Sequence, residues 1–211
     1  DSRFDDAVPH EGFVLGATTF LMASIYGLFF RSMLEIPEQV RKGTMDFVLT
    51  KPVDSQFWAT MRRFNFDQIG SLAAGVILLG YGVSQMDASV GPLQWVGYCS
   101  LLLFGISLFY SLNLVLMSMS VWFVRVDNLW VLSETLLDVS RFPIDIFGQA
   151  VQRTLVFIIP LAFFATVPAR QLAQGFELPM IFLGALWAVL TLTGSRAFWR
   201  FALKSYSSAS S

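Results

Sequence analysis

Five charged side chains lie close together in an otherwise apolar part of the sequence: Glu134, Asp138, Arg141, Asp145 and Arg153. From Glu134 to Asp145, each member follows the previous one by three or four residues, so a continuous helix would place them on one face, where opposite charges can pair. A charge in lipid costs about 2.5–3.5 kcal/mol on insertion scales. We therefore expect this face to point at protein or water.

Two interpretations of this charged series remain open. In the first, it is a polar strip that lines a dimer interface or an export path and attracts a cationic or zwitterionic substrate. In the second, it is a ladder of structural ion pairs on a helix lying in the plane of the cytoplasmic membrane surface, followed by a span from about Ile144. In both, we expect Arg153 in the outer half of a re-entrant or crossing element that Pro160 interrupts.

A second group of charged residues lies in the segment 31–63. Pro37 near a helix start, Gly43 in the middle and Pro52 at the end predict two short helical pieces. Apolar and charged side chains alternate irregularly along them, which is typical of a helix at the membrane interface with a charged face toward the cytosol. An ordinary amphipathic loop helix, without a special function, is enough to explain the composition of this segment.

Composition excludes several classes of function. The formal net charge is -1, so no basic field is available to hold DNA or RNA. A single cysteine, Cys99, and a single histidine, His10, cannot supply a disulfide within the chain, a Cys-rich zinc site or a pair of histidine ligands. We expect no catalytic residue and no metal site.

The elements that position these groups are predicted by the gaps between charges. The sequence is 55% hydrophobic and only 14% charged, and five segments carry no charge over lengths close to the ~20 residues that cross a bilayer as a helix. No alternating strand pattern is present, so the sequence predicts an all-α, polytopic helical membrane protein. Small residues in the second gap would let helices pack closely: Gly70, Ala73, Ala74 and Gly80.

We expect one transmembrane domain over residues 1–211. Its parts are spans at 12–31, 65–85, 92–123 and 178–196, a coupling loop at 35–60, a charged Pro-containing span with a re-entrant element at 129–169, and a cytoplasmic tail at 197–211.

Orientation follows from the basic residues, because cytoplasmic loops hold an excess of Lys and Arg. Placing ten of the fourteen inside requires the N-terminus to be outside and the C-terminus in the cytoplasm, with five crossings. The acidic start and the absence of Met at position 1 indicate that a removed signal peptide or an earlier helix delivered it there.

Three motifs resemble one family, the type-2 ATP-binding-cassette (ABC-2 type) exporter permeases. The run VRKGTMDFVLTKPVDSQF is similar to its cytoplasmic signature, in which charged residues lead into Gly-Thr, an acidic residue, leucines and a proline. The run FPIDIFGQAVQRTLVFIIPLAFFATVPARQL resembles its Pro-rich penultimate region. The ending RFALKSYSSASS is similar to the Tyr-Ser-Ser-Ala motif of one branch. The family usually has six helices, which suggests that the first is absent here.

This resemblance implies a type-2 ABC exporter transmembrane fold and a permease that works as a dimer with itself or a related permease. ATP and Mg would bind to separate ATPase subunits, since the sequence has no Gly-rich phosphate loop. The loop after the first span would be the coupling helix, with apolar contacts from Met45, Phe47 and Val48. The implied coupling residues are Glu38, Arg41, Lys42, Gly43, Thr44, Asp46 and Phe47.

Sparse intramembrane charge and abundant aromatic residues favour an amphipathic or hydrophobic substrate, such as a drug-like cation or a lipid. The membrane would be a bacterial-type inner membrane. Two alternatives are a scaffold subunit of a larger membrane complex and a lipid-modifying membrane enzyme. The enzyme would have only Glu134, Asp138 and Asp145 as acidic candidates.

Overall fold

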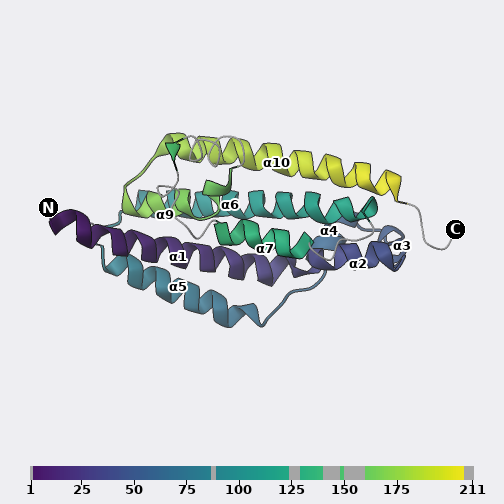
Figure 1. The fold of residues 1–211 in the computed structure, drawn as a ribbon, viewed down its shortest axis with the longest axis horizontal. Coiled ribbons are helices and arrows are strands. Elements are labelled where there is room, and N and C mark those ends of the chain that lie inside the picture. The colour runs from purple at the N-terminus through teal and green to yellow at the C-terminus, as the bar shows by residue number, and fades with distance from the viewer. Residues whose placement is uncertain (1, 87–88, 124–128, 140–147, 150–159, 207–211) are drawn as a thin grey trace.

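The computed structural model describes residues 2–86, 89–123, 129–139, 148–149 and 160–206, and within these ranges it contains helices and no strand (Figure 1). The predicted all-α class is therefore confirmed. Three helices are long and apolar enough to cross a membrane, by length and composition. They are α1 (Ser2–Phe30), α6 (Pro92–Ser118) and α10 (Leu178–Ser205).

The helix α5 (Gln68–Ser84) is apolar but shorter, and it packs antiparallel to α1 (Figure 1). A β-carbon at Gly75 would lie 2.8 Å from Leu21 Cδ2, and one at Gly82 would lie 3.1 Å from Val14 Cγ2. These two glycines let the helices approach closely. The expectation that Gly70 and Gly80 do this is wrong for this helix pair. They lie on the other face of α5, where a β-carbon meets nothing within 4 Å.

Between α1 and α5 the chain forms four short helical segments, where the sequence predicts two. They are η1 (Arg31–Glu35), α2 (Ile36–Arg41), α3 (Asp46–Leu49) and α4 (Ser55–Met61), and we call them together the short-helix unit. Pro37 lies in the first turn of α2, as predicted. Gly43 follows α2 with a positive φ of 68°, which favours glycine and turns the chain toward α3.

The short-helix unit packs on the ends of α6 and α10 through an apolar cluster that includes Met45, Met117 and Trp199. This packing explains why α10 runs to Ser205 and does not end near Arg196. The helix thus continues past residue 196, where the sequence analysis places the start of the tail, and Trp199 and Ala202 in this part are buried.

A buried segment fills the other end of the bundle. It comprises η4 (Leu161–Phe163) and α9 (Thr166–Ala173), and every residue from Pro160 to Ala169 is buried. The backbone of Phe163 lies so close to α6 that a β-carbon at Gly105 would collide with its carbonyl oxygen. The Phe163 ring lies 3.1 Å from the position of a β-carbon at Gly184 of α10. The segment is therefore held between two of the long helices.

The long helices α1, α6 and α10 run in one direction and α5 runs back (Figure 1). The end of α6 lies beside the short-helix unit, whereas α9 packs near its start. The helix α7 (Leu129–Val139) lies roughly along the axis of the long helices (Figure 1). If those helices span the membrane, α7 does not lie in its plane.

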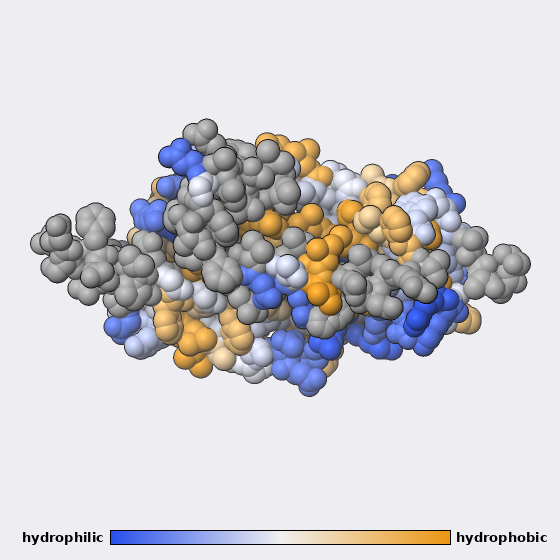
Figure 2. All heavy atoms as spheres, in the orientation of Figure 1, coloured by the Kyte–Doolittle hydropathy of each residue, from blue (hydrophilic) through white to orange (hydrophobic). Residues whose placement is uncertain are grey.

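The outer faces of α5 and α10 are apolar. Ile77 on α5 and Phe182 and Val189 on α10 are exposed. In this view, hydrophobic residues form patches along the sides of the molecule, and hydrophilic ones lie toward both ends and along the lower edge (Figure 2). Apolar outer faces are what a lipid-facing helix bundle requires.

We expect Gly105→Ala to destabilise the protein by about 1–3 kcal/mol, because the added methyl forces the backbone of Phe163 away from α6. The measurement is thermal unfolding in detergent, followed by tryptophan fluorescence. The matched control is Gly80→Ala, where a β-carbon meets no atom within 4 Å. Equal effects of the two changes would contradict a close contact at Gly105.

Candidate functional site

The residues predicted for coupling gather on the outer surface of α2 and α3. Arg41, Lys42 and Thr44 are exposed, and the Phe47 ring is 71% exposed. Met45 and Val48 are not available to a partner, because they are only 1% and 3% exposed and pack inside the chain. The expectation that these two side chains contact an ATPase is therefore wrong. Met45 and Val48 are three residues apart and lie on the same side of the short helix α3, the side that faces the core, whereas Phe47 lies on the exposed side.

Glu38 and Lys42 form an ion pair of 2.6 Å between Oε1 and Nζ, one turn apart on α2. Hydrogen bonding from Lys42, and its charge, hold the pKa of Glu38 below its ordinary value. Both side chains are exposed, so this pair shapes the polar face of α2 and contributes little to folding.

Gly43 positions this face. Its N–H donates to the Val40 carbonyl at 3.2 Å, and the Met45 N–H donates to the Gln39 carbonyl at 3.2 Å, which closes the turn between α2 and α3. Asp46 begins α3 and lies near Tyr206, the first residue after α10. Partial burial, and then the negative charge of Asp46, raise the pKa of Tyr206. The loop signature and the end of α10 are thus packed together.

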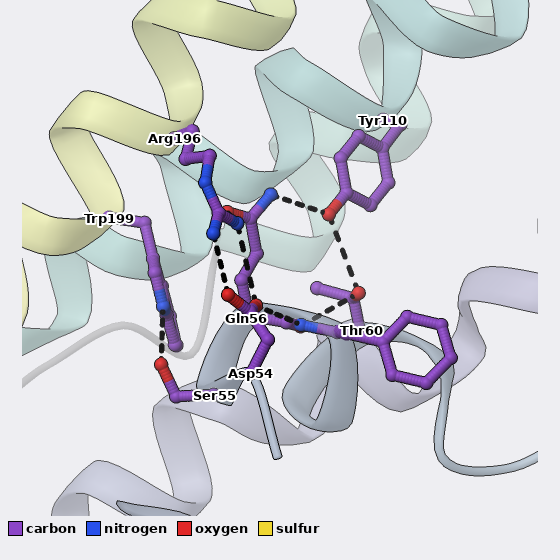
Figure 3. Close-up of polar contacts among 8 residues, drawn as sticks. Asp54, Ser55, Gln56, Thr60, Tyr110, Arg196 and Trp199 are labelled. Carbon is purple, nitrogen blue, oxygen red and sulfur yellow. Dashed lines mark hydrogen bonds and ion pairs between the residues drawn. The ribbon is translucent and has the colours of Figure 1, made fainter.

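A polar cluster that the sequence analysis missed joins α4 to α6 and α10 (Figure 3). Arg196 of α10 donates from Nη2 to Asp54 Oδ2 at 2.6 Å and from Nη1 to Gln56 Oε1 at 3.0 Å. Gln56 Nε2 then donates to the Tyr110 hydroxyl of α6 at 2.9 Å. We call these four residues the α4 clamp. They are distant in sequence, so no local pattern could indicate the cluster.

Asp54 has a second role as the N-cap of α4, where its Oδ1 accepts from the Phe57 N–H at 3.0 Å. The hydrogen bond from Arg196, and then that from Phe57, lower the pKa of Asp54 below its ordinary value. At neutral pH the carboxylate is charged, and the same side chain begins the helix and ties it to α10.

Beside the α4 clamp, Trp199 adds an apolar contact. It is 2% exposed, and its Nε1 donates to Ser55 Oγ at 3.2 Å (Figure 3). Within the short-helix unit, Glu35 of η1 forms ion pairs with Arg62 and Arg63, and the Arg63 N–H donates to Ser32 Oγ at 3.1 Å. The unit is joined to α1 because η1 follows it directly and because the Asn65 N–H, just after α4, donates to the Leu28 carbonyl of α1 at 3.0 Å.

The predicted polar strip is described only in part. Glu134 and Asp138 lie on α7 and line a cavity of about 540 Å³ between α1, α5, α6 and α7, together with Arg31 and Gln68. Arg141, Asp145 and Arg153 lie outside the described residues. The four-residue spacing therefore does place the first two carboxylates on one face, and that face borders a cavity.

The exposed face of α2 and α3 and the cavity beside α7 can bind a partner or a ligand through charged and apolar contacts. In the described part of the chain, no three His, Cys, Asp or Glu side chains are grouped to hold a metal ion.

Comparison with known families gives one match, which covers nearly the whole chain. Residues 10–210 match the family model described as ABC-2 family transporter protein. No curated protein and no solved structure matches the chain significantly. The match includes the short-helix unit, the buried segment and the described part of α10. This chain belongs to the ABC-2 family of transporter proteins.

Proposed function

We propose that this protein is the permease subunit of an ATP-driven exporter, and that its short-helix unit is the docking site for an ATPase subunit. Membership of the ABC-2 family supports a membrane component of a transporter that is not itself catalytic. ATP and Mg then bind to the partner. The permease works as a dimer with itself or with a related permease, and two ATPase subunits bind to the pair.

One observation carries this proposal: an exposed basic and apolar face sits on a unit that is firmly attached to three long helices. Arg41 and Lys42 supply the charge, and Phe47 and Leu49 supply exposed apolar surface. Such a face fits a groove with an acidic rim and an apolar floor. A rigid attachment is necessary because a mobile loop would absorb the movement of the ATPase.

The contacts of the α4 clamp suggest how the movement reaches the membrane helices. A displacement of α3 or α4 pulls on Asp54 and Gln56, and these residues hold Arg196 of α10 and Tyr110 of α6. The buried Trp199 turns the same displacement into a push on α10. We propose that these contacts drive alternating access, with export of an amphipathic or hydrophobic substrate, a drug-like cation or a lipid.

The proposed orientation puts the short-helix unit and the end of α10 in the cytoplasm, and the N-terminus outside a bacterial-type inner membrane. The excess of basic residues at this end supports it, because Lys and Arg favour the cytoplasmic side. They are Arg31, Arg41, Lys42, Lys51, Arg62, Arg63, Arg196, Arg200 and Lys204.

Binding of an ATPase should depend on the exposed face of α2 and α3. We expect the double change Arg41→Glu and Lys42→Glu to abolish co-purification of an ABC ATPase from solubilised membranes, because it reverses the charge of that face. Glu177→Lys, an exposed change at the opposite end of the bundle, should leave co-purification intact. If no ATPase co-purifies with the wild type, the proposal fails and the scaffold alternative is favoured.

The transmission of ATPase movement to the membrane helices should depend on the α4 clamp, whereas binding of the ATPase should not. We expect Arg196→Gln to retain the ATPase but to reduce substrate-stimulated ATP hydrolysis by roughly two- to fivefold, which corresponds to the free energy of one exposed ion pair. Arg200→Gln, one turn further along α10 and exposed, is the matched control and should behave as wild type. An equal loss in both variants would show that the clamp has no specific role.

A further inference from the structure

The cavity bordered by α7 has no part in the attachment of the short-helix unit, and its lining is unusual in combining opposite charges with aromatic rings. Its volume of about 540 Å³ is in the range of small-molecule sites, roughly 300–1,000 Å³. Its wall includes Arg31, the first residue of η1, and Glu134 and Asp138 on α7. We infer that this cavity binds a zwitterionic amphiphile, a molecule with an ammonium group, an acidic group and a hydrocarbon tail.

The charged groups support this ligand class. Glu134 and Asp138 are four residues apart on one helix, so their carboxylates repel one another, and a single ammonium group placed against them lowers that repulsion. Arg31 lines the same cavity and suits a phosphate or carboxylate, which guanidinium groups bind in bidentate geometry. Neither Arg31 nor Glu134 forms an ion pair with another described residue.

The uncharged part of the wall supports an amphiphile over a small polar zwitterion. Tyr26 and Phe109 form an edge-to-face pair with ring centroids 4.6 Å apart, and both line the cavity with Leu34 and Leu137. Aromatic faces attract ammonium groups, and the leucines suit a hydrocarbon chain. Such a wall would gain little from a ligand without a tail.

Two polar side chains on the wall are placed to recognise a headgroup. Ser133 is 4% exposed and lines the cavity, so its hydroxyl can hydrogen-bond to a polar headgroup there. Gln68 lies across Gly27, where its Cδ would be 3.2 Å from a β-carbon, so the glycine leaves room for the amide at the cavity wall.

A ligand with only a positive charge does not fit this lining as well, because Arg31 would repel it. A ligand with only a negative charge would meet two carboxylates. A zwitterion places an opposite charge against Arg31 and against the carboxylate of Glu134 at the same time. This inference deepens the proposed function and rests on it, since it assigns the cavity to the exported substrate.

The test compares three single-chain probes with the same dodecyl tail: dodecylphosphocholine, dodecyltrimethylammonium and dodecyl sulfate. Each competes with a fluorescent dodecylphosphocholine analogue for the purified permease in lipid nanodiscs, below its micelle-forming concentration. We expect the zwitterion to bind about tenfold more tightly than either singly charged probe, because each of those probes lacks one of its two charge–charge attractions. Equal binding of all three probes, or tightest binding of a singly charged one, overturns the inference.

Variants locate the site. Glu134→Gln with Asp138→Asn should remove the preference over dodecyl sulfate, and Arg31→Gln should remove the preference over dodecyltrimethylammonium. Glu177→Gln and Arg200→Gln are the matched controls away from the cavity lining, and both should keep the wild-type order. Retention of that order by the cavity variants also overturns the inference.

A further pair of competitors separates the two sources of such a ligand. A diacyl phosphatidylethanolamine that competes as well as dodecylphosphocholine indicates a membrane lipid, whereas competition by the single-chain probe alone indicates a free amphiphile. Both outcomes support a zwitterion site. Because this assay needs no ATPase, its failure is distinct from a failure of ATPase co-purification, which would overturn the exporter function and leave the binding site standing.

Discussion

A peptide group inside a bilayer has no water to bond with, and most of this architecture follows from that constraint. Helices satisfy the constraint along their own length, which accounts for α1, α6 and α10. The backbone between Pro160 and Ala165 is mostly not α-helical, and it is tolerated because every residue there is buried between other helices. Gly105 and Gly184 make this possible, since a side chain at either position would occupy the space of Phe163.

The opposite end of the molecule meets a different requirement, because it must be soluble and yet firmly attached. The short-helix unit meets it with two faces. Its inner face buries Met45 and Val48 against Trp199, and its outer face presents Arg41, Lys42 and Phe47. The α4 clamp lies between these faces and adds directional contacts to the apolar ones. A surface of this construction can bind a partner and still transmit a displacement to α6 and α10.

The cavity beside α7 adjoins the short-helix unit. Charged groups are costly in lipid, and here Glu134 and Asp138 lie against a cavity wall with Arg31. Arg31 is also the first residue after α1, where the short-helix unit begins. A displacement of that unit would therefore change the cavity directly, which gives the proposed substrate site a short path to the proposed ATPase site.

The sequence by itself determined the helical class, the long apolar helices, the helix start at Pro37 and the turn at Gly43. These depend on local properties: the length of an uncharged run, the fixed φ of proline and the freedom of glycine. Tertiary structure alone decided that Met45 is buried while Phe47 is exposed, that Gly75 and Gly82 pack on α1 while Gly70 and Gly80 do not, and that Asp54 holds Arg196. Those outcomes depend on which face of a helix meets a neighbour far away in the sequence, and periodicity gives the face but not the neighbour.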